Sequence, residues 1–157
     1  MQKPESDKLM QDNNTPVEIL IVEDNPNDAT LMLRALRKNH VSNNIKICED
    51  GEEALDFLFS KGRFEGETIP STIKVVFLDL KLPKINGLEV LKEIRDNETT
   101  HKMPVVVVTS SKEDPDIKAA YELGVNSYVV KPVQFEDFVQ AVAQVGMYWL
   151  LLNEPPK

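Results

Sequence analysis

The sequence predicts one α/β domain built on a doubly wound parallel sheet, and two observations lead to this fold class. Short runs of Val, Ile and Leu alternate with longer segments of helical periodicity, which makes five strand-then-helix units. The runs are apolar throughout, as in Val105–Val108, and such runs are typical of strands that are covered on both faces. A chain of 157 residues is large enough to bury a core of this kind.

Strands and helices are expected to alternate along the whole folded part of the chain. The apolar runs predict strands at residues 17–22, 45–48, 73–78, 103–109 and 127–130. The helical patterns predict helices at residues 26–38, 51–60, 87–95, 114–123 and 134–152. One connection, residues 61–72, is polar and leads into the third strand.

Residues at the helix boundaries support these assignments. Asn25 is a good N-cap, and Pro26 after it suits the first helical position because the N–H that proline lacks would have no helical partner there. Gly124 follows the fourth predicted helix, where a left-handed residue commonly ends a helix. We therefore expect the first helix to begin directly after the first strand.

The composition excludes several classes of function. A formal net charge of −8 argues against nonspecific nucleic-acid binding, which needs a basic surface. Cys48 is the only cysteine, so neither an intramolecular disulfide nor a thiolate zinc cluster is expected. Residues 1–16 are polar and predict a disordered tail rather than a signal peptide, and no apolar run approaches the roughly 20 residues that span a bilayer. We expect one cytoplasmic domain at residues 17–152, with no membrane contact and a short tail at residues 153–157.

Acidic, hydroxyl and basic side chains follow the predicted strands at the end where ligands bind in open parallel sheets. They are Glu23 and Asp24 after the first strand, Asp79 after the third, Thr109 at the end of the fourth and Lys131 after the fifth. A lone acid at the end of a strand is usually only a turn or cap residue. The convergence of five such residues favours a functional site.

The chemistry of this set favours phosphoryl transfer with a divalent cation. Carboxylate oxygens are the ligands that Mg²⁺ prefers, and clustered carboxylates should raise the pKa of one member in the absence of a cation. Lys131 supplies a mobile positive charge and Thr109 a hydrogen-bond donor for the transferred group. Under this interpretation Asp79 is the nucleophile.

These residues and their surroundings resemble the receiver domains of two-component response regulators. The matching stretches are ILIVEDN, VVFLDLKLPKINGLEVL, VVVVTSS and NSYVVKPV. The separations of Asp79, Thr109 and Lys131 agree with that family, whereas Asp24 and Asp79 are further apart than usual, with the surplus in residues 61–72. The resemblance covers residues 17–152 and implies a flavodoxin-like sheet with strand order 2-1-3-4-5 and helices on both faces.

The resemblance also implies a role for each site residue. Asp79 would accept a phosphoryl group from a phosphohistidine of a partner histidine kinase. Glu23, Asp24, Asp79 and the backbone carbonyl of Lys81 would hold Mg²⁺. The protein would then be a signalling switch rather than an enzyme, with its chemistry limited to gaining and losing one phosphoryl group.

Further residues would read out and limit the phosphorylated state. Lys131, joined to Pro132 by a cis peptide bond, would contact the phosphoryl group, and Thr109 would move towards it. Tyr128 would change rotamer between inward and outward positions. The side chains of Lys81 and Ser111 would flank the path of the hydrolytic water and thereby set the lifetime of the phosphoryl group.

A finer resemblance concerns the partner. Four stretches are similar to small receiver-only regulators paired with bacterial phytochrome-type histidine kinases. They are VEDNPNDA, GEEALDFLF, LGVNSYVVKPV and YWLLLNEPP.

No second domain is expected, so output would pass through protein contacts. The end of the last predicted helix is apolar on several faces and predicts a homodimer surface, the alternative being a tail that folds back over the domain. The residues of this surface are Met147, Tyr148, Trp149, Leu150 and Leu151.

Three other functions are less well supported by the residues. A phosphatase with an aspartate nucleophile resembles this topology but needs a second acid two positions later, where this chain has Lys81. A nucleotide-binding protein would carry a Gly-rich phosphate loop after the first strand, where EDNPND stands. A degenerate receiver that only binds partners would not need the complete set of acids, threonine and lysine.

Overall fold

The computed structural model describes residues 16–38, 41, 43–66, 72–132, 134 and 136. Residues 1–15 of the predicted tail, the predicted closing helix apart from residues 134 and 136, and the whole predicted dimer surface lie outside the described residues. In the part of the chain that the structure describes, no helix is long and apolar enough to cross a membrane.

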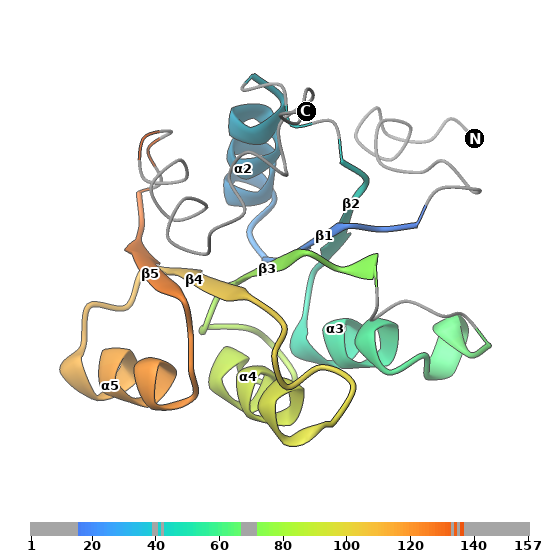
Figure 1. The fold of residues 1–157 in the computed structure, drawn as a ribbon. Helices are drawn as coiled ribbons and strands as arrows, with labels where there is room; N and C mark the ends of the chain where they lie inside the picture. The colour runs from blue at the N-terminus through green and yellow to red at the C-terminus, as the bar shows by residue number, and fades with distance from the viewer. Residues whose placement is uncertain are drawn as a thin grey trace, which may run out of the picture.

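A five-stranded parallel sheet forms the centre of the domain (Figure 1). Its strands are β1 (Ile19–Val22), β2 (Ile45–Cys48), β3 (Val75–Leu78), β4 (Val105–Thr109) and β5 (Ser127–Val130). They lie in the order β2-β1-β3-β4-β5, and every neighbouring pair is parallel. The predicted fold class and strand order are confirmed.

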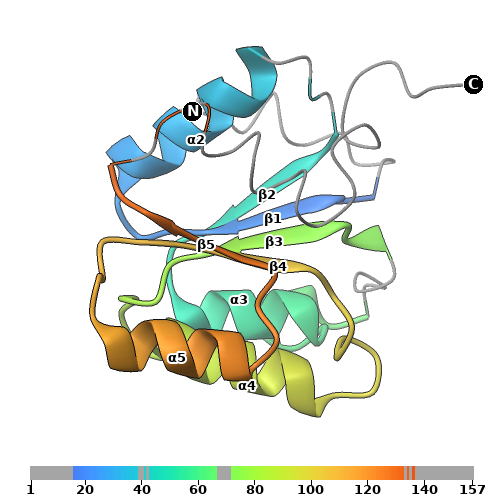
Figure 2. The same cartoon turned by 60° about the vertical axis from the view of Figure 1, so that its left-hand side comes forward.

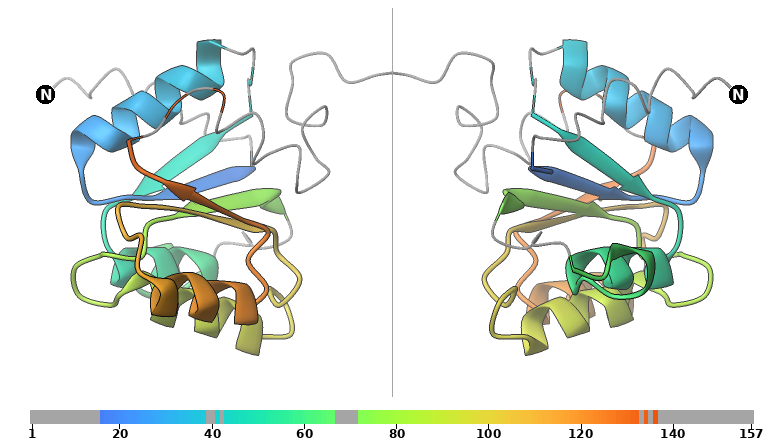
Figure 3. Two further views of the ribbon diagram at one scale, coloured as in Figure 1. Left: turned by 90° about the vertical axis from the view of Figure 1, so that its left-hand side faces the viewer. Right: turned by 90° about the vertical axis from the view of Figure 1, so that its right-hand side faces the viewer.

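Helices cover both faces of this sheet. They are α2 (Pro26–Lys38), α3 (Gly51–Leu58), α4 (Gly87–Asp96) and α5 (Asp114–Glu122). Figures 2 and 3 show α2 on one face and α3, α4 and α5 side by side on the other. A short 3₁₀ helix, η1 (Gly62–Phe64), lies in the connection for which no regular structure was predicted, and its Phe64 ring packs edge-on against Phe57 with 5.2 Å between the ring centroids.

The core has two layers because successive residues of a strand face opposite sides of the sheet. In β1, Ile19 and Ile21 face α2, whereas Leu20 and Val22 face α3 and α4. The buried residues of α2 are the four that the helical pattern predicts, Ala29, Met32, Leu33 and Leu36. The opposite layer contains the buried residues Leu55, Leu58, Val90, Leu91 and Ile94 of α3 and α4.

Three strands begin two residues later than predicted. Val17, Ile73 and Met103 are apolar and pack on the core, but each precedes the first residue of its strand. Burial therefore extends beyond the regular ladder of backbone hydrogen bonds, and an apolar run alone overestimates the length of a strand.

The predicted start of α2 and the predicted end of α5 are confirmed. Oδ1 of Asn25 accepts hydrogen bonds from the backbone N–H groups of Asn27 and Asp28, at 2.9 and 3.1 Å. Gly124 follows α5 with a φ of +75°, a left-handed conformation that glycine adopts without strain. The cap on α2 fixes the first turn of that helix at the edge of the sheet where the strands end.

Strand register brings the candidate site residues to this edge. Val22 pairs with Leu78, so Glu23 and Asp79 are neighbours as they leave β1 and β3. The N–H of Asp79 donates to the carbonyl of Val22 at 3.0 Å, and the N–H of Lys131 donates to the carbonyl of Thr109 at 2.9 Å. Backbone hydrogen bonding thus continues past β3 and β5 and holds both site residues in place.

Candidate functional site

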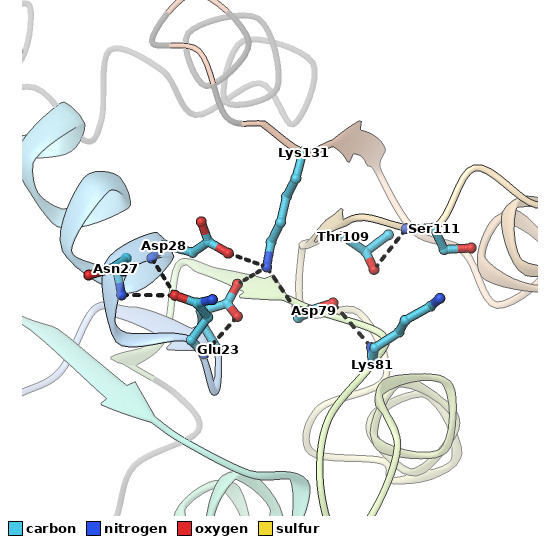
Figure 4. Close-up of polar contacts among 9 residues, drawn as sticks. Glu23, Asn27, Asp28, Asp79, Lys81, Thr109, Ser111 and Lys131 are labelled. Carbon is cyan, nitrogen blue, oxygen red and sulfur yellow. Dashed lines mark hydrogen bonds and ion pairs between the residues drawn. The ribbon is translucent and has the colours of Figure 1, made fainter.

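The amino group of Lys131 lies among three carboxylates at the carboxyl edge of the sheet. Its Nζ is 3.0 Å from Oδ2 of Asp79, 2.9 Å from Oδ2 of Asp28 and 2.7 Å from Oε1 of Glu23. Figure 4 shows the side chain extending from the end of β5 towards all three. Burial alone would lower the pKa of Lys131, but the three carboxylates outweigh it and raise the pKa above its ordinary value. Lys131 is therefore a fixed positive charge at the centre of the site.

Glu23, Asp24 and Asp79 form an acidic cluster beside Lys131. One carboxylate oxygen from each lies within 4.8 Å of the other two. Glu23 and Asp79 are buried, whereas Asp24 is exposed. Three hard oxygen donors that converge from neighbouring strand ends fit a divalent cation with further water ligands.

The carboxyl group of Glu23 has a perturbed pKa. The pKa of Glu23 is raised from 4.5 to about 7. Burial is the largest cause and the Asp79 carboxylate adds to it, while Lys131 and the N–H of Asn25 oppose the increase. This shift agrees with the prediction that one acid of the cluster has a raised pKa. The leading cause is burial, however, rather than the repulsion between acids from which we predicted it.

Both oxygens of the Asp79 side chain have partners. Oδ1 accepts a hydrogen bond from the N–H of Lys81 at 3.1 Å, and Oδ2 accepts one from Nζ of Lys131 at 3.0 Å. These bonds hold the carboxylate at the mouth of β3, with one oxygen towards the β3–α4 loop and the other towards β5. The structure places the backbone of Lys81 beside Asp79, and its role as a metal ligand stays a prediction.

Thr109 and Ser111 line the β4 side of the site. The Thr109 side chain is fully buried, and its Oγ1 accepts the N–H of Ser111 at 3.4 Å. The Ser111 hydroxyl donates to Oδ2 of Asp116, on the first turn of α5, at 2.5 Å. Asp116, which was not predicted from the sequence, engages the hydroxyl that we expect to flank the hydrolytic water.

Tyr128 connects this loop to β5. Its hydroxyl donates to the backbone carbonyl of Ser111 at 3.1 Å, and its ring stacks on Tyr121 of α5 with 6.4 Å between centroids. Partial burial raises the pKa of the Tyr128 hydroxyl. Directly after β5, the Lys131–Pro132 peptide bond is cis, as expected.

The structure brings together Glu23, Asp24, Asp79 and Lys131 as the sequence predicts, with Thr109 at the end of the adjacent strand. It also adds Asp28, which was not predicted from the sequence as a site residue. The position of Asp28 near the site could have been expected from the sequence, because a helix that starts directly after a strand keeps its first turn near the same edge of the sheet. The contact of Asp28 with Lys131 depends, however, on how α2 lies across the sheet.

Comparison with known proteins places this site in a family. Residues 19–143 match the family model of the response regulator receiver domain. The probable methanogenesis regulatory protein FilR2 of Methanothrix harundinacea is 42% identical over 142 residues, which cover 90% of this chain and 88% of FilR2. The response regulator Rcp1 of Synechocystis sp. is 36% identical over 90% of this chain and 95% of Rcp1.

Solved structures give the same result. The bacteriophytochrome response regulator RtBRR aligns with a TM-score of 0.79 and 47% identity, over 90% of this chain and 85% of RtBRR. The Mn²⁺-bound form of Rcp1 aligns with a TM-score of 0.72 and 36% identity, over 90% of this chain and the whole of that chain.

Proposed function

Since this chain belongs to the response regulator receiver domain family, we propose that Asp79 is its phosphoacceptor and that phosphorylation of Asp79 switches its contacts with other proteins. Receiver domains take their phosphoryl group from histidine kinases. The observation that carries the assignment to Asp79 is the position of its carboxylate, which belongs to the acidic cluster and also contacts the Lys131 ammonium.

The proposed reaction is a nucleophilic substitution at phosphorus. A carboxylate oxygen of Asp79 forms a bond to the phosphorus of a phosphohistidine, and the P–N bond breaks as the imidazole leaves and is protonated. Lys131 compensates the negative charge of the phosphoryl oxygens because its ammonium is already oriented towards Asp79. Thr109 and Tyr128 would then respond to the new group, the first by its hydroxyl and the second by its rotamer.

Glu23, Asp24 and Asp79 would hold the divalent cation, together with the backbone carbonyl of Lys81. The three carboxylates fit such an ion because all are oxygen donors and converge within 4.8 Å. When bound, the ion neutralises negative charge at the carboxylates and at the incoming phosphoryl group. We propose Mg²⁺ as the resident ion because it prefers oxygen ligands and keeps water ligands; the Rcp1 structure holds Mn²⁺.

We propose a switch rather than an enzyme with a separate substrate. The alternative, an aspartate-nucleophile phosphatase, needs a general acid two residues after the nucleophile. Lys81 stands at that position, is exposed and offers no carboxyl group. The chemistry of the chain is then limited to phosphorylation of Asp79 and hydrolysis of the product.

The partner kinase is proposed to be of the phytochrome type and to act in the cytoplasm, where ATP is available to it. The likeness to RtBRR supports this, since that protein is named a bacteriophytochrome response regulator. FilR2 is similar in identity but is named for the regulation of methanogenesis. Phosphotransfer from a purified phytochrome-type kinase, compared with a kinase of another class, decides between these partners.

A homodimer through Met147, Tyr148, Trp149, Leu150 and Leu151 stays part of the proposal, although these residues lie outside the described ones. Sedimentation of the wild type against Trp149→Glu and Leu151→Glu tests it. A dimer that either charge disrupts supports the surface, whereas a monomeric wild type at micromolar concentration contradicts it.

The central experiment is phosphorylation with Mg²⁺ and a small phosphodonor such as acetyl phosphate. We expect a base-labile phosphate on the wild type, none on Asp79→Asn, and unchanged labelling of Asp96→Asn, an exposed acid at the end of α4. Equal labelling of the wild type and Asp79→Asn would show that another residue is the acceptor.

A further inference from the structure

We propose that Asp28 is a positioning residue that helps the acidic site to accept a divalent cation. Its carboxylate gives Lys131 a partner outside the proposed metal ligands, so that Glu23 and Asp79 can turn from the lysine to the ion. The inference rests on the proposed divalent site but not on the identity of the phosphoacceptor.

Lys131 contacts one oxygen on each of two carboxylates that would hold the cation. One oxygen of Glu23 contacts Nζ of Lys131 and the other accepts the N–H of Asn25 at 3.1 Å. Asp79 has the same arrangement, with one oxygen on Lys131 and the other on the N–H of Lys81. Lys131 and a divalent ion therefore compete for two of the three carboxylates in the cluster.

Asp28 bonds to Lys131 without belonging to that cluster. Its Oδ2 accepts a hydrogen bond from Nζ at 2.9 Å, but Asp28 is not one of the three carboxylates that converge within 4.8 Å. The Asp28 side chain is 28% exposed, compared with 6% for Asp79 and 1% for Glu23. It can therefore stay paired with the ammonium at the rim while the two deeper carboxylates change partners.

The backbone keeps Asp28 in position for this contact. Asn25 joins the two sides of the site, because its N–H donates to Oε2 of Glu23 and its Oδ1 accepts the N–H of Asp28. Asp28 also lies in the first turn of α2, where the helix dipole favours a carboxylate. The local fold thus aims a charged acceptor at Lys131 from the side opposite to β4 (Figure 4).

Asp28 lowers the free-energy cost of separating Lys131 from Glu23 and Asp79. An ammonium has three N–H donors, and withdrawing two partners from a largely buried ammonium is costly unless another acceptor remains. With Asp28 present, Lys131 keeps a charged partner after the ion binds. Without it, Lys131 holds Glu23 and Asp79 more firmly, and the affinity for the ion falls.

Calorimetric titration of the full chain with Mg²⁺, and in parallel with Mn²⁺, tests this inference. We expect Asp28→Asn to raise the Kd about three- to fivefold, and Lys131→Met to lower the Kd because the competitor is gone. In the Lys131→Met background, Asp28→Asn should have little further effect. Lys131→Gln repeats the comparison with a polar neutral side chain, and thermal unfolding verifies that each variant is folded.

The double variant separates positioning from simple charge removal, because loss of any acid weakens cation binding through the electrostatic field. Glu49→Gln is the matched control, since Glu49 is an exposed acid after β2 and is not among the ion-pair partners of Lys131. An effect of Asp28→Asn no larger than that of Glu49→Gln, or equal in both Lys131 backgrounds, overturns the inference. So does weaker ion binding by Lys131→Met.

The two proposals fail in different ways. If the wild type binds no divalent ion, both the proposed metal site and the role of Asp28 are refuted. If it binds the ion and is phosphorylated on Asp79, but Asp28→Asn leaves the Kd unchanged, only the role of Asp28 is refuted.

Discussion

Gly87 packs directly against the backbone of Asp79. A Cβ atom on Gly87 would lie 2.1 Å from the carbonyl oxygen of Asp79 and 2.5 Å from Cα of Leu80. The N–H of Gly87 also donates to the carbonyl of Leu80 at 2.8 Å. The start of α4 is thus pressed onto the residue that carries the proposed phosphoacceptor, and only a residue without a side chain permits this approach.

Gly87→Ala should therefore destabilise the domain and displace Asp79. Overpacking against backbone that cannot move aside costs about 2 kcal/mol or more. Chemical unfolding measures the loss, and phosphorylation with a small donor should be slower. Lys92→Ala, an exposed position in the same helix, should stay within about 0.5 kcal/mol of the wild type. Equal stabilities of the two variants would contradict the close packing.

Arg95 joins the end of α4 to the segments before β4 and β5. Its guanidinium donates to four backbone carbonyls, those of His101, Met103, Leu123 and Gly124, at 2.7 to 3.1 Å. Arg95→Leu should lower the free energy of unfolding by about 2 kcal/mol because these carbonyls lose their charged donor. Arg95→Lys should recover only part of this loss of stability, since an ammonium is a point charge and cannot reach all four carbonyls as the planar guanidinium does. Full recovery by lysine in denaturant unfolding would show that charge alone matters.

The raised pKa of Glu23 predicts how stability depends on pH in the absence of divalent ions. The folded protein keeps the proton up to about pH 7, whereas the unfolded chain loses it near pH 4.5. Folding is therefore favoured by this group below pH 4.5, and that contribution is lost as the pH rises through 7. Glu23→Gln should remove this part of the pH dependence in thermal unfolding. An unchanged profile would mean that Glu23 titrates normally.

The raised pKa of Glu23 also predicts that metal binding releases protons. Below about pH 7 an ion has to displace the proton of Glu23, so the affinity for Mg²⁺ should rise from pH 6 to pH 8. Titrations in buffers of different ionisation enthalpy measure the released protons. Binding without proton release at pH 6 would contradict the raised pKa.

Lys81 is expected to shield the phosphorylated Asp79 from water. Its N–H is bonded to the Asp79 carboxylate and its side chain is exposed beside the site. Lys81→Ala should open the path of the hydrolytic water and shorten the lifetime of the phosphoryl group. Ser111→Ala should alter it as well, because it removes the hydroxyl that Asp116 engages. Lys112→Ala, exposed in the same loop as Ser111, is the control, and equal dephosphorylation rates in all variants would refute the assignment.

The fold could be predicted because its signals are local. The continuous apolar run of β4 indicates burial on both faces, and the spacing of Met32, Leu33 and Leu36 indicates a helix with one buried face. The 3₁₀ helix η1 was missed because it lies in a segment without periodicity and its Phe64 packs on Phe57 of α3, which is a tertiary contact. The late starts of three strands have a similar cause, since burial and backbone pairing end at different residues.

The site residues could be identified from the sequence because parallel strands bring the residues that follow them to one edge of the sheet. Glu23, Asp24, Asp79, Thr109 and Lys131 could therefore be named in advance. The contact between Lys131 and Asp28, which are 103 positions apart in the sequence, could be recognised only in the folded domain. That contact depends on the angle at which α2 packs over the sheet, and the angle follows from the fit of side chains in the core. Periodicity along the chain does not encode that fit.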